Sequence, residues 1–336
     1  MKIGKRLSFV LAVAFIFSWV AAAQAAPDFD FFKGKVITYV VATKPGGGYD
    51  AYARMIGRHM QKYIPGATII VKNTPGAGHI IGANDVYRAR PDGLTMGTFS
   101  TGLIYSQIVG LEGIKFDLSK YSWIGKASAE HRVLIVSAKS PFKTIKDFVD
   151  SKEPVKLGSS GVGTADHNET FIIADALGAK VRVIAGFGGQ EAEMAMLRGE
   201  ISGLIGSYSS LAAFVRAKEC RVLLQISRTK HKELPDVPLA LEQKLSDRGK
   251  KLVALVGGIA ELWRLTAAPP SIPAEKLEVV RTAYKKALTD PELLKEAAKM
   301  ETGIDPAFGE DVAKLVKEAL DQPQENITLL KQIVKE

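Results

Sequence analysis

The sequence predicts an α/β protein in which two domains face each other across a cleft. Three observations predict this fold. The chain has 336 residues, 46% of them hydrophobic, which is enough for two domains with real cores. Apolar runs that do not alternate, as in strands covered on both faces, are repeatedly followed by glycine or hydroxyl loops and a helix start. After a first unit over residues 35–99, a second unit of the same pattern begins near Lys126.

The first 25 residues are typical of a secretory signal peptide. The basic start MKIGKR precedes an apolar run over residues 7–23, which ends at the small-x-small site Ala23-Gln24-Ala25. An uncleaved anchor is the alternative, but the run is short for a membrane span. We therefore expect cleavage after about Ala25 and a periplasmic protein without a later span.

The stretch over residues 36–57 contains the first candidate binding loop. Residues 36–41 predict a buried strand, residues 45–48 a glycine-rich turn, and Asp50 the N-cap of a helix. A helix that starts directly after glycines offers unpaired N–H groups and a positive dipole end, which favour a carboxylate. Lys44 adds a positive charge. The candidate residues are Lys44, Pro45, Gly46, Gly47, Gly48, Tyr49 and Asp50.

Two alternatives apply to this stretch. It lacks the GxxxxGK[ST] and GxGxxG spacings, so we expect no nucleotide site there. The glycines could also serve only to make a tight turn from strand to helix, and the sequence leaves that alternative open.

The rest of the first unit predicts two further strands with polar loops after them. A strand over residues 68–71 precedes a glycine-rich turn over 73–78, and a helix from about residue 80 ends before Pro91. A strand over residues 94–99 follows, and then Thr101. Because ligands bind at the carboxyl ends of strands in open α/β sheets, Thr101 is a candidate site residue.

The second unit predicts strands over residues 133–136, 155–157, 181–184, 201–205 and 222–226. A capping box at Thr144 and Asp147 predicts a helix between the first two. Its candidate site residues come from the loops at strand ends: Ser159, Ser160, Gly161, Gly163, Thr164, His167, Ser207 and Tyr208. For His167 the alternative is a helix-start residue that bonds to its own loop.

The remaining chain predicts the domain division. Residues 252–257 predict a strand, and Lys- and Glu-rich helices follow the segment over 263–270. These late segments need the first sheet for cover. We therefore expect residues 27–125 plus 229–336 to form one domain and residues 126–228 to form the other.

Charge and cysteine content limit the partners. The leader holds three basic residues and no acid, so the mature net charge is +9 minus 3, or +6, which helps to gather small anions. No basic stripe with interleaved aromatic residues occurs, so we expect no nucleic-acid partner. Cys220 predicts a buried thiol. We expect a monomer.

An enzyme is the alternative to a binding protein. It would use His167 with Asp166 or Glu169 beside the nearby hydroxyls, but the sequence has no GxSxG elbow. Its five histidines show no HExxH spacing. We expect no catalytic residues, no metal and no cofactor.

Taken together, the motifs resemble the Bug family, the TctC-like extracytoplasmic receptors of tripartite tricarboxylate transporters. The shared motifs, in order, are Pro45-Gly46-Gly47-Gly48 with Asp50, residues 73–78, Gly82-Ala83, Pro91-Asp92-Gly93, residues 161–164 with His167, Arg228 with residues 234–238, and residues 263–273. The chain differs from the residues that the family usually has at positions 42–44, at Tyr49 and after Ile184.

The resemblance implies a two-domain type II periplasmic-binding-protein (Venus-flytrap) fold that closes on a ligand. The ligand implied is a small mono- or dicarboxylate, and the partners implied are the membrane permease subunits of a tripartite tricarboxylate transporter. A ligand-sensing partner of a membrane sensor kinase is the alternative, which the receptor sequence alone does not separate from transport.

Overall fold

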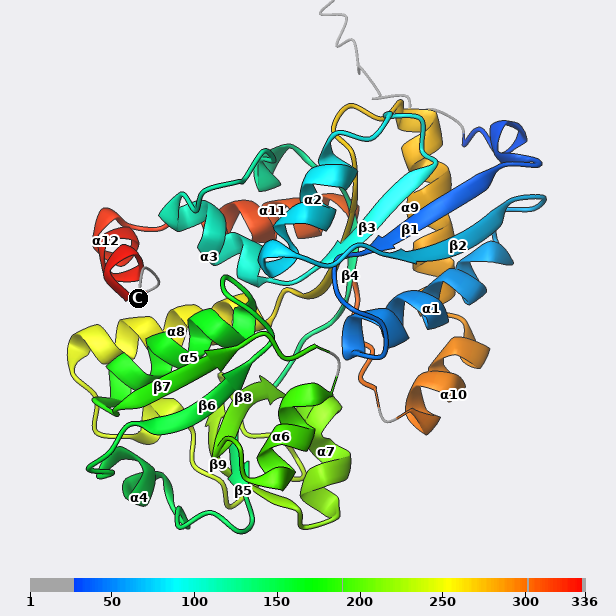
Figure 1. Ribbon diagram of the computed structural model, residues 1–336. Helices are drawn as coiled ribbons and strands as arrows, with labels where there is room; N and C mark the ends of the chain where they lie inside the picture. Colours follow the sequence, from blue (N-terminus) through cyan, green and yellow to red (C-terminus); the bar gives the residue numbers. More distant parts are fainter. Residues whose placement is uncertain (1–26, 189, 301, 334–336) are drawn as a thin grey trace, which may run out of the picture.

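Two β-sheets, each covered by helices on both faces, make up the protein (Figure 1). The computed structural model describes residues 27–188, 190–300 and 302–333, so the predicted signal peptide lies outside the described residues. Within that part of the chain, no helix has the length and apolar character that crossing a membrane requires.

The first sheet has the strand order β11-β4-β10-β3-β1-β2. Its strands are β1 (Val36–Val41), β2 (Thr68–Asn73), β3 (Thr95–Phe99), β4 (Ser122–Ser128), β10 (Trp263–Ala268) and β11 (Ala307–Phe308). Its helices are α1 (Gly48–Gln61), α2 (Ile80–Tyr87), α3 (Gly102–Val109), α9 (Ala274–Leu288), α10 (Pro291–Lys299) and α11 (Gly309–Leu320). Strands β1, β2 and β3 are parallel, whereas β10 is antiparallel to β3 and β4.

Strand β1 carries apolar side chains on both of its faces, which explains why helices cover both faces of this sheet. Ile37, Tyr39 and Val41 are buried in a cluster with α1 and α9. Val40 and Ala42 are buried in a second cluster with α2, α3 and α11. Since successive side chains of a strand point to opposite faces, a run that is apolar at both parities needs cover on both sides.

The second sheet has the order β7-β6-β8-β5-β9. Its strands are β5 (Arg132–Ser137), β6 (Val155–Ser159), β7 (Val181–Ala185), β8 (Gly203–Ser207) and β9 (Cys220–Ile226). Its helices are α4 (Ile145–Val149), α5 (Ala165–Leu177), α6 (Glu191–Arg198), α7 (Tyr208–Arg216) and α8 (Asp247–Ala260). Apolar residues of α5 and α8 cover one face, and those of α6 and α7 cover the other.

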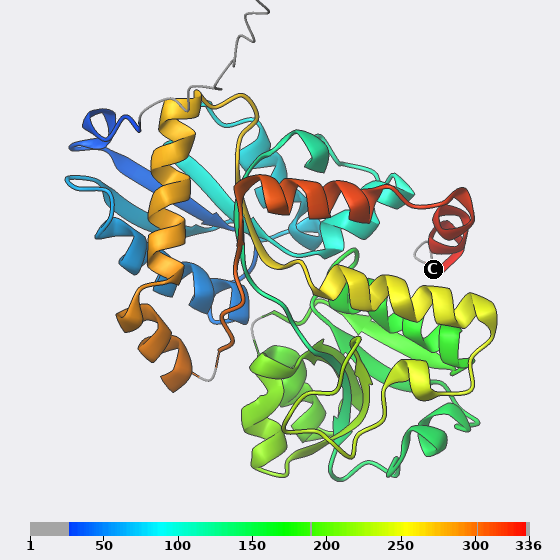
Figure 2. The ribbon, with the colours of Figure 1, turned by 180° about the vertical axis from the view of Figure 1, so that it is seen from behind.

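The chain crosses between the sheets directly after β4 and returns directly before β10. After each crossing the chain enters a strand that is antiparallel to its neighbours. These strands are β5 in the second sheet and β10 in the first. Helix α12 (Gln324–Ile333) contacts both α3 and α5, so it touches both units. Figure 2 shows from behind that α9 and α11 belong to the upper unit and α8 to the lower one. Short 3-10 turns lie at Asp30–Phe32, Ala77–His79, Leu118–Lys120 and Ala240–Glu242.

Two features of the second unit differ from the sequence analysis. Residues 252–257, predicted as a strand, lie in helix α8, whose N-cap Ser246 accepts a hydrogen bond from the Gly249 N–H. A short apolar run suits a buried helix as well as a strand, so periodicity does not distinguish them. Helix α8 packs against α5, and Lys126 belongs to β4 in the first sheet. The division of the chain into two domains at residues 125/126 and 228/229 stays a prediction.

Candidate functional site

A cavity of about 770 Å³ lies between the two units, at the carboxyl ends of strands from both sheets. Of the predicted site residues, those that line it are Lys44, Gly46, Gly47, Gly48, Tyr49, Ser160, Gly161, Thr164 and Ser207. Those that are not among the lining residues are Pro45, Asp50, Thr101, Ser159, Gly163, His167 and Tyr208. The first sheet therefore contributes the glycine turn and the second sheet contributes the loops after β6 and β8.

Helix α1 begins at Gly48 with Gly47 as its N-cap, so the expectation that Asp50 caps the helix is wrong. Asp50 lies inside the first turn, where its carboxylate accepts hydrogen bonds from the Gly46 N–H and Arg54 Nε, both at 3.0 Å. Burial opposes ionisation of Asp50, but these bonds and one from Asn73 outweigh it and lower the pKa of Asp50. The helix therefore begins before the predicted cap, and Gly46, with a positive φ of 87°, lies in the turn that precedes it.

Arg264 on β10 is a residue that the sequence analysis missed. Its side chain lines the cavity although the residue is only 3% exposed. The guanidinium carbon lies 4.2 Å from the ring centre of Tyr49 and 4.7 Å from that of Tyr52. A Cβ on Gly48 would lie 2.3 Å from one terminal nitrogen of Arg264, so the glycine makes room for this cation at the start of α1.

No carboxylate among the described residues forms an ion pair with Arg264, and its Nε has no hydrogen-bond partner there. A buried cation without a counter-ion is costly, since desolvation is not offset by attraction to a negative charge. An anion in the cavity would supply that charge. Arg264 follows Trp263 at the start of a strand, and this pair of residues alone gives no sign of burial.

Arg132, at the start of β5, was also missed. It lines the cavity and is 2% exposed. Its Nε donates to Glu169 on α5 at 2.6 Å, and its Nη1 donates to the Ser207 hydroxyl at 3.2 Å. Burial raises the pKa of Glu169 to about 7, although Arg132 acts in the opposite direction. The two residues form a buried ion pair beneath the cavity.

Several polar groups of the predicted loops already have partners within their own loop. The Ser160 N–H donates to Asp166 at 2.6 Å, and the Thr164 hydroxyl donates to the Gly161 carbonyl at 2.6 Å. His167 is buried edge-on against Phe171 and its Nδ1 lies 3.4 Å from the Asn168 side-chain oxygen. These loops are therefore ordered by their own hydrogen bonds.

The other predicted residues lie beside or behind the cavity. Thr101 is the N-cap of α3 and is fully buried, and Ser159 at the end of β6 is fully buried as well. The Tyr208 hydroxyl donates to Glu233 at 3.1 Å, on the side of α7 that packs on residues 231–233. The cavity is thus lined by buried cations, whereas the sequence analysis expected mainly N–H groups and hydroxyls there.

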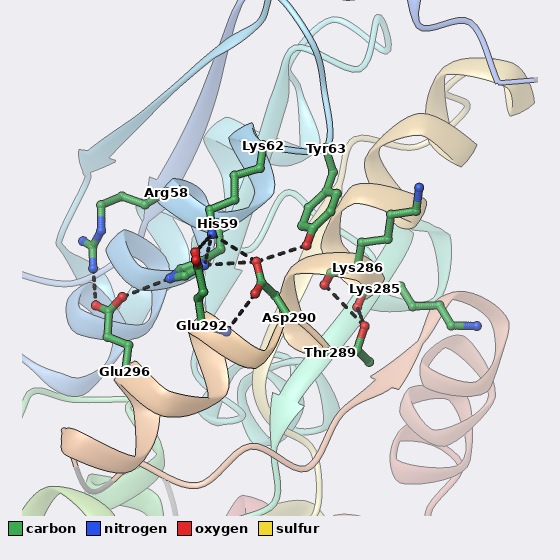
Figure 3. Close-up of polar contacts among 10 residues, drawn as sticks. All are labelled: Arg58, His59, Lys62, Tyr63, Lys285, Lys286, Thr289, Asp290, Glu292 and Glu296. Atoms are coloured by element: carbon green, nitrogen blue, oxygen red, sulfur yellow. Dashed lines mark hydrogen bonds and ion pairs between the residues drawn. The ribbon is translucent and has the colours of Figure 1, made fainter.

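A separate polar cluster joins the end of α1 to the start of α10 (Figure 3), and its residues are not among those that line the cavity. His59, Asp290 and Glu292 each offer one atom within 4.8 Å of the others, a spacing that could hold a metal ion. However, Lys62 Nζ already lies 3.1 Å from Asp290 and also contacts Glu292. The ammonium thus supplies the positive charge of this cluster, and the arrangement fixes α10 to α1.

Lys44 crosses the cavity toward the second unit. Its Nζ lies 3.6 Å from Glu191 Oε2 on α6, and its side chain is about half exposed. Because exposed ion pairs contribute only about 0.2 to 1 kcal/mol, we predict that Lys44→Met weakens ligand binding less than about fivefold. Calorimetric titration tests this, with Glu191→Gln as the matched variant that leaves Lys44 unpaired. A loss of more than about tenfold in Lys44→Met would instead place the ammonium on the ligand.

Glu193 on α6 lines the cavity and is 8% exposed. Burial raises the pKa of Glu193 from 4.5 to about 7. The folded protein therefore holds a proton that the unfolded chain releases between these values, so this group lowers the stability as pH rises through that window.

We predict that Glu193→Gln raises the free energy of unfolding by about 2 kcal/mol at pH 8 and much less at pH 5. Urea unfolding at both pH values measures it. Glu153→Gln, at an exposed position, is the control and should leave the stability unchanged at both. An equal effect of Glu193→Gln at pH 5 and pH 8 would contradict the assignment.

The two sheets, the crossings between them and the cavity at their facing edges define a two-domain α/β solute-binding protein. The chain belongs to the TctC family, described as the tripartite tricarboxylate transporter family receptor, which it matches over residues 52–333. This confirms the predicted resemblance and fold class. The family and its structural neighbours are binding proteins rather than enzymes, and the family is periplasmic.

Three known proteins illustrate the similarity. The UPF0065 protein of the tcbD-tcbE intergenic region of Pseudomonas sp. (strain P51) is 30% identical over 313 residues, covering 91% of this chain and 89% of that protein. The periplasmic binding protein BugD has a TM-score of 0.76 at 20% identity, covering 89% of this chain and 97% of BugD. MatC from Rhodopseudomonas palustris, solved with bound malate, has a TM-score of 0.71 at 19% identity, covering 89% and 99%.

Proposed function

We propose that this protein captures a small organic mono- or dicarboxylate in the cavity between its two units and delivers it to the membrane permease subunits of a tripartite tricarboxylate transporter. The observation that carries this proposal is Arg264, a buried guanidinium that lines the cavity and has no ion-pair partner among the described residues. A carboxylate is the ligand whose two oxygens match the planar fork of a guanidinium.

The start of α1 adds to this anion preference. The guanidinium of Arg264 lies against Gly48, the first residue of the helix, and an added Cβ there would also be 3.0 Å from the Ser210 hydroxyl of α7. The first N–H groups of a helix have no partner inside the helix, and its dipole is positive at that end. One carboxylate at this point would thus meet a full positive charge, backbone donors and a hydroxyl from the opposite unit.

The aromatic rings around Arg264 fix the cation in place. Tyr49 and Tyr52 hold the guanidinium by cation–π contacts, and Trp263 lies 5.4 Å from the guanidinium carbon. A cation that is already oriented loses little rotamer freedom when the ligand binds. The rings also shield the charge from water, which strengthens its attraction to an anion.

The relatives support a carboxylate ligand and a periplasmic location. The malate bound to MatC is a small dicarboxylate, and BugD is a periplasmic protein. The N-terminal leader motif supports export, with cleavage after about Ala25. We propose that the mature protein acts as a periplasmic monomer.

A thermal-shift screen tests the proposed function. The mature protein is heated with a panel of mono- and dicarboxylates, with neutral sugars and simple cations as controls. Because a ligand that binds only the folded state stabilises it by mass action, we expect at least one organic acid to raise the melting temperature in a concentration-dependent way. Stabilisation by sugars or cations but by no organic acid would contradict the proposal.

A further inference from the structure

The second unit contributes a buried acid to the wall of the cavity. Glu193 lies in the first turn of α6 and lines the cavity at 8% exposure. Met196, three residues later and therefore on the same side of the helix, is fully buried in the apolar cluster of α6, α7 and the second sheet. An apolar side chain would suit the position of Glu193, because burying a carboxyl group costs free energy unless it has a partner.

Glu193 has no such partner in the protein. No cation among the described residues forms an ion pair with it. Burial and the negative charge of Asp166 both raise the pKa of Glu193, and only its own backbone N–H acts in the opposite direction. The anionic form of Glu193 therefore lacks a counter-ion on the second unit, just as the guanidinium of Arg264 lacks one on the first.

The part of the cavity wall around Glu193 is mainly apolar. It is formed by α6, α7, β8 and the loop after β7, through Phe187, Ala192, Leu204, Ile205 and Ala213. Charges attract more strongly in such surroundings than in water, because the local dielectric constant is lower. The cavity thus offers a cation on the wall of the first unit, an apolar stretch, and an acid on the wall of the second unit.

We infer that Glu193 binds a cationic amine, so that the preferred ligand is an ω-amino acid whose carboxylate lies at Arg264 and whose ammonium lies at Glu193. This inference rests on the proposed function and narrows its ligand class. The ligand supplies the missing counter-ion of each unit and links the two through charge-assisted hydrogen bonds. A diacid in the same position would bring its second carboxylate against Glu193 and Asp166, where like charges repel.

Pairs of acids with the same shape test this inference by calorimetric titration of the mature protein. We compare γ-aminobutyrate with pentanoate and ε-aminohexanoate with heptanoate, because each amine differs from its partner only by an ammonium in place of the terminal methyl group. We expect the better amino acid to bind roughly tenfold more tightly than its alkyl partner or better, the contribution of one hydrogen bond between charged groups.

The outcomes separate this inference from the proposed function. Alkyl acids that bind as tightly as the amino acids would overturn the inference and leave the proposed function standing, whereas failure of every organic acid to bind would overturn both. Norleucine carries the same amine and carboxylate as ε-aminohexanoate, but on neighbouring carbons. Equal affinity for these two isomers would also overturn the inference, because the far end of the ligand would then not be recognised.

A variant test assigns the preference to Glu193. Glu193→Gln keeps the size of the side chain and removes its charge, so the amino acid should lose its advantage while the alkyl acid keeps its affinity. Glu200→Gln is the matched control, because Glu200 is exposed just beyond α6 and pairs with Arg198 instead. The preference should persist there. An unchanged preference in Glu193→Gln, with urea unfolding showing a folded protein, would overturn the inference.

Discussion

Replacing Arg264 by Met is expected to weaken binding of the best carboxylate by about 100- to 1000-fold, or roughly 3 to 4 kcal/mol. The side chain is buried, faces the cavity and has no counter-ion among the described residues, so the ligand supplies its charge partner. The same change should raise the unfolding free energy of the ligand-free protein by about 1 kcal/mol or more, because an unpaired buried charge is removed.

Opposite changes in affinity and stability distinguish a ligand-binding cation from a structural one. Arg264 has a positive φ of 61°, and the Met variant keeps a Cβ at that position, so the backbone strain is unchanged. Arg264→Lys is the matched control, since it keeps the charge and should restore part of the affinity. Calorimetric titration and urea unfolding give the two quantities. Wild-type affinity in the Met variant would remove Arg264 from the site.

Replacing Gly102 by Ala is expected to weaken ligand binding by about 1 to 3 kcal/mol, the usual cost of overpacking. A Cβ at Gly102 would lie 2.5 Å from the Ala165 backbone nitrogen and 2.8 Å from the Gly163 carbonyl oxygen. Gly102 begins α3 in the first unit, and these atoms lie at the start of α5 in the second. Backbone atoms cannot swing aside as a side chain can, so the two units must separate.

Small-angle scattering and calorimetry measure this effect together. With saturating ligand, the Gly102→Ala protein should have a larger radius of gyration than the wild type and a lower affinity. Gly257→Ala is the matched control, because it also adds a methyl group to a helix but its Cβ would have no neighbour closer than 3.9 Å. A Gly102→Ala protein as compact and as tight-binding as the wild type would contradict this contact.

The fold class could be predicted because its signals are local. Unalternating apolar runs such as residues 36–41, each followed by a polar or glycine loop, identify strands buried on both faces and the edge where a ligand binds. The run at residues 252–257 was predicted wrongly because a short apolar stretch suits a strand and a buried helix equally.

The cations of the site could not be predicted because their burial arises from tertiary packing. Arg132 and Arg264 stand at the starts of strands, where an arginine is ordinarily exposed. Only the packing of the two units brings both guanidiniums to the ring of Trp263 and to one cavity. Lys44, which the sequence did single out, also lines the cavity, with its Nζ 3.6 Å from Glu191 Oε2.

The central claim is that the cavity recognises the negative charge of a carboxylate. The most direct test is calorimetric titration of the mature wild-type protein with its best carboxylate and with the corresponding methyl ester. The ester keeps the shape and the carbonyl oxygen but removes the charge. We predict saturable one-to-one binding of the acid and a loss of about 100-fold or more for the ester, matching the expected loss in Arg264→Met. Equal affinity for the acid and its ester would contradict the claim.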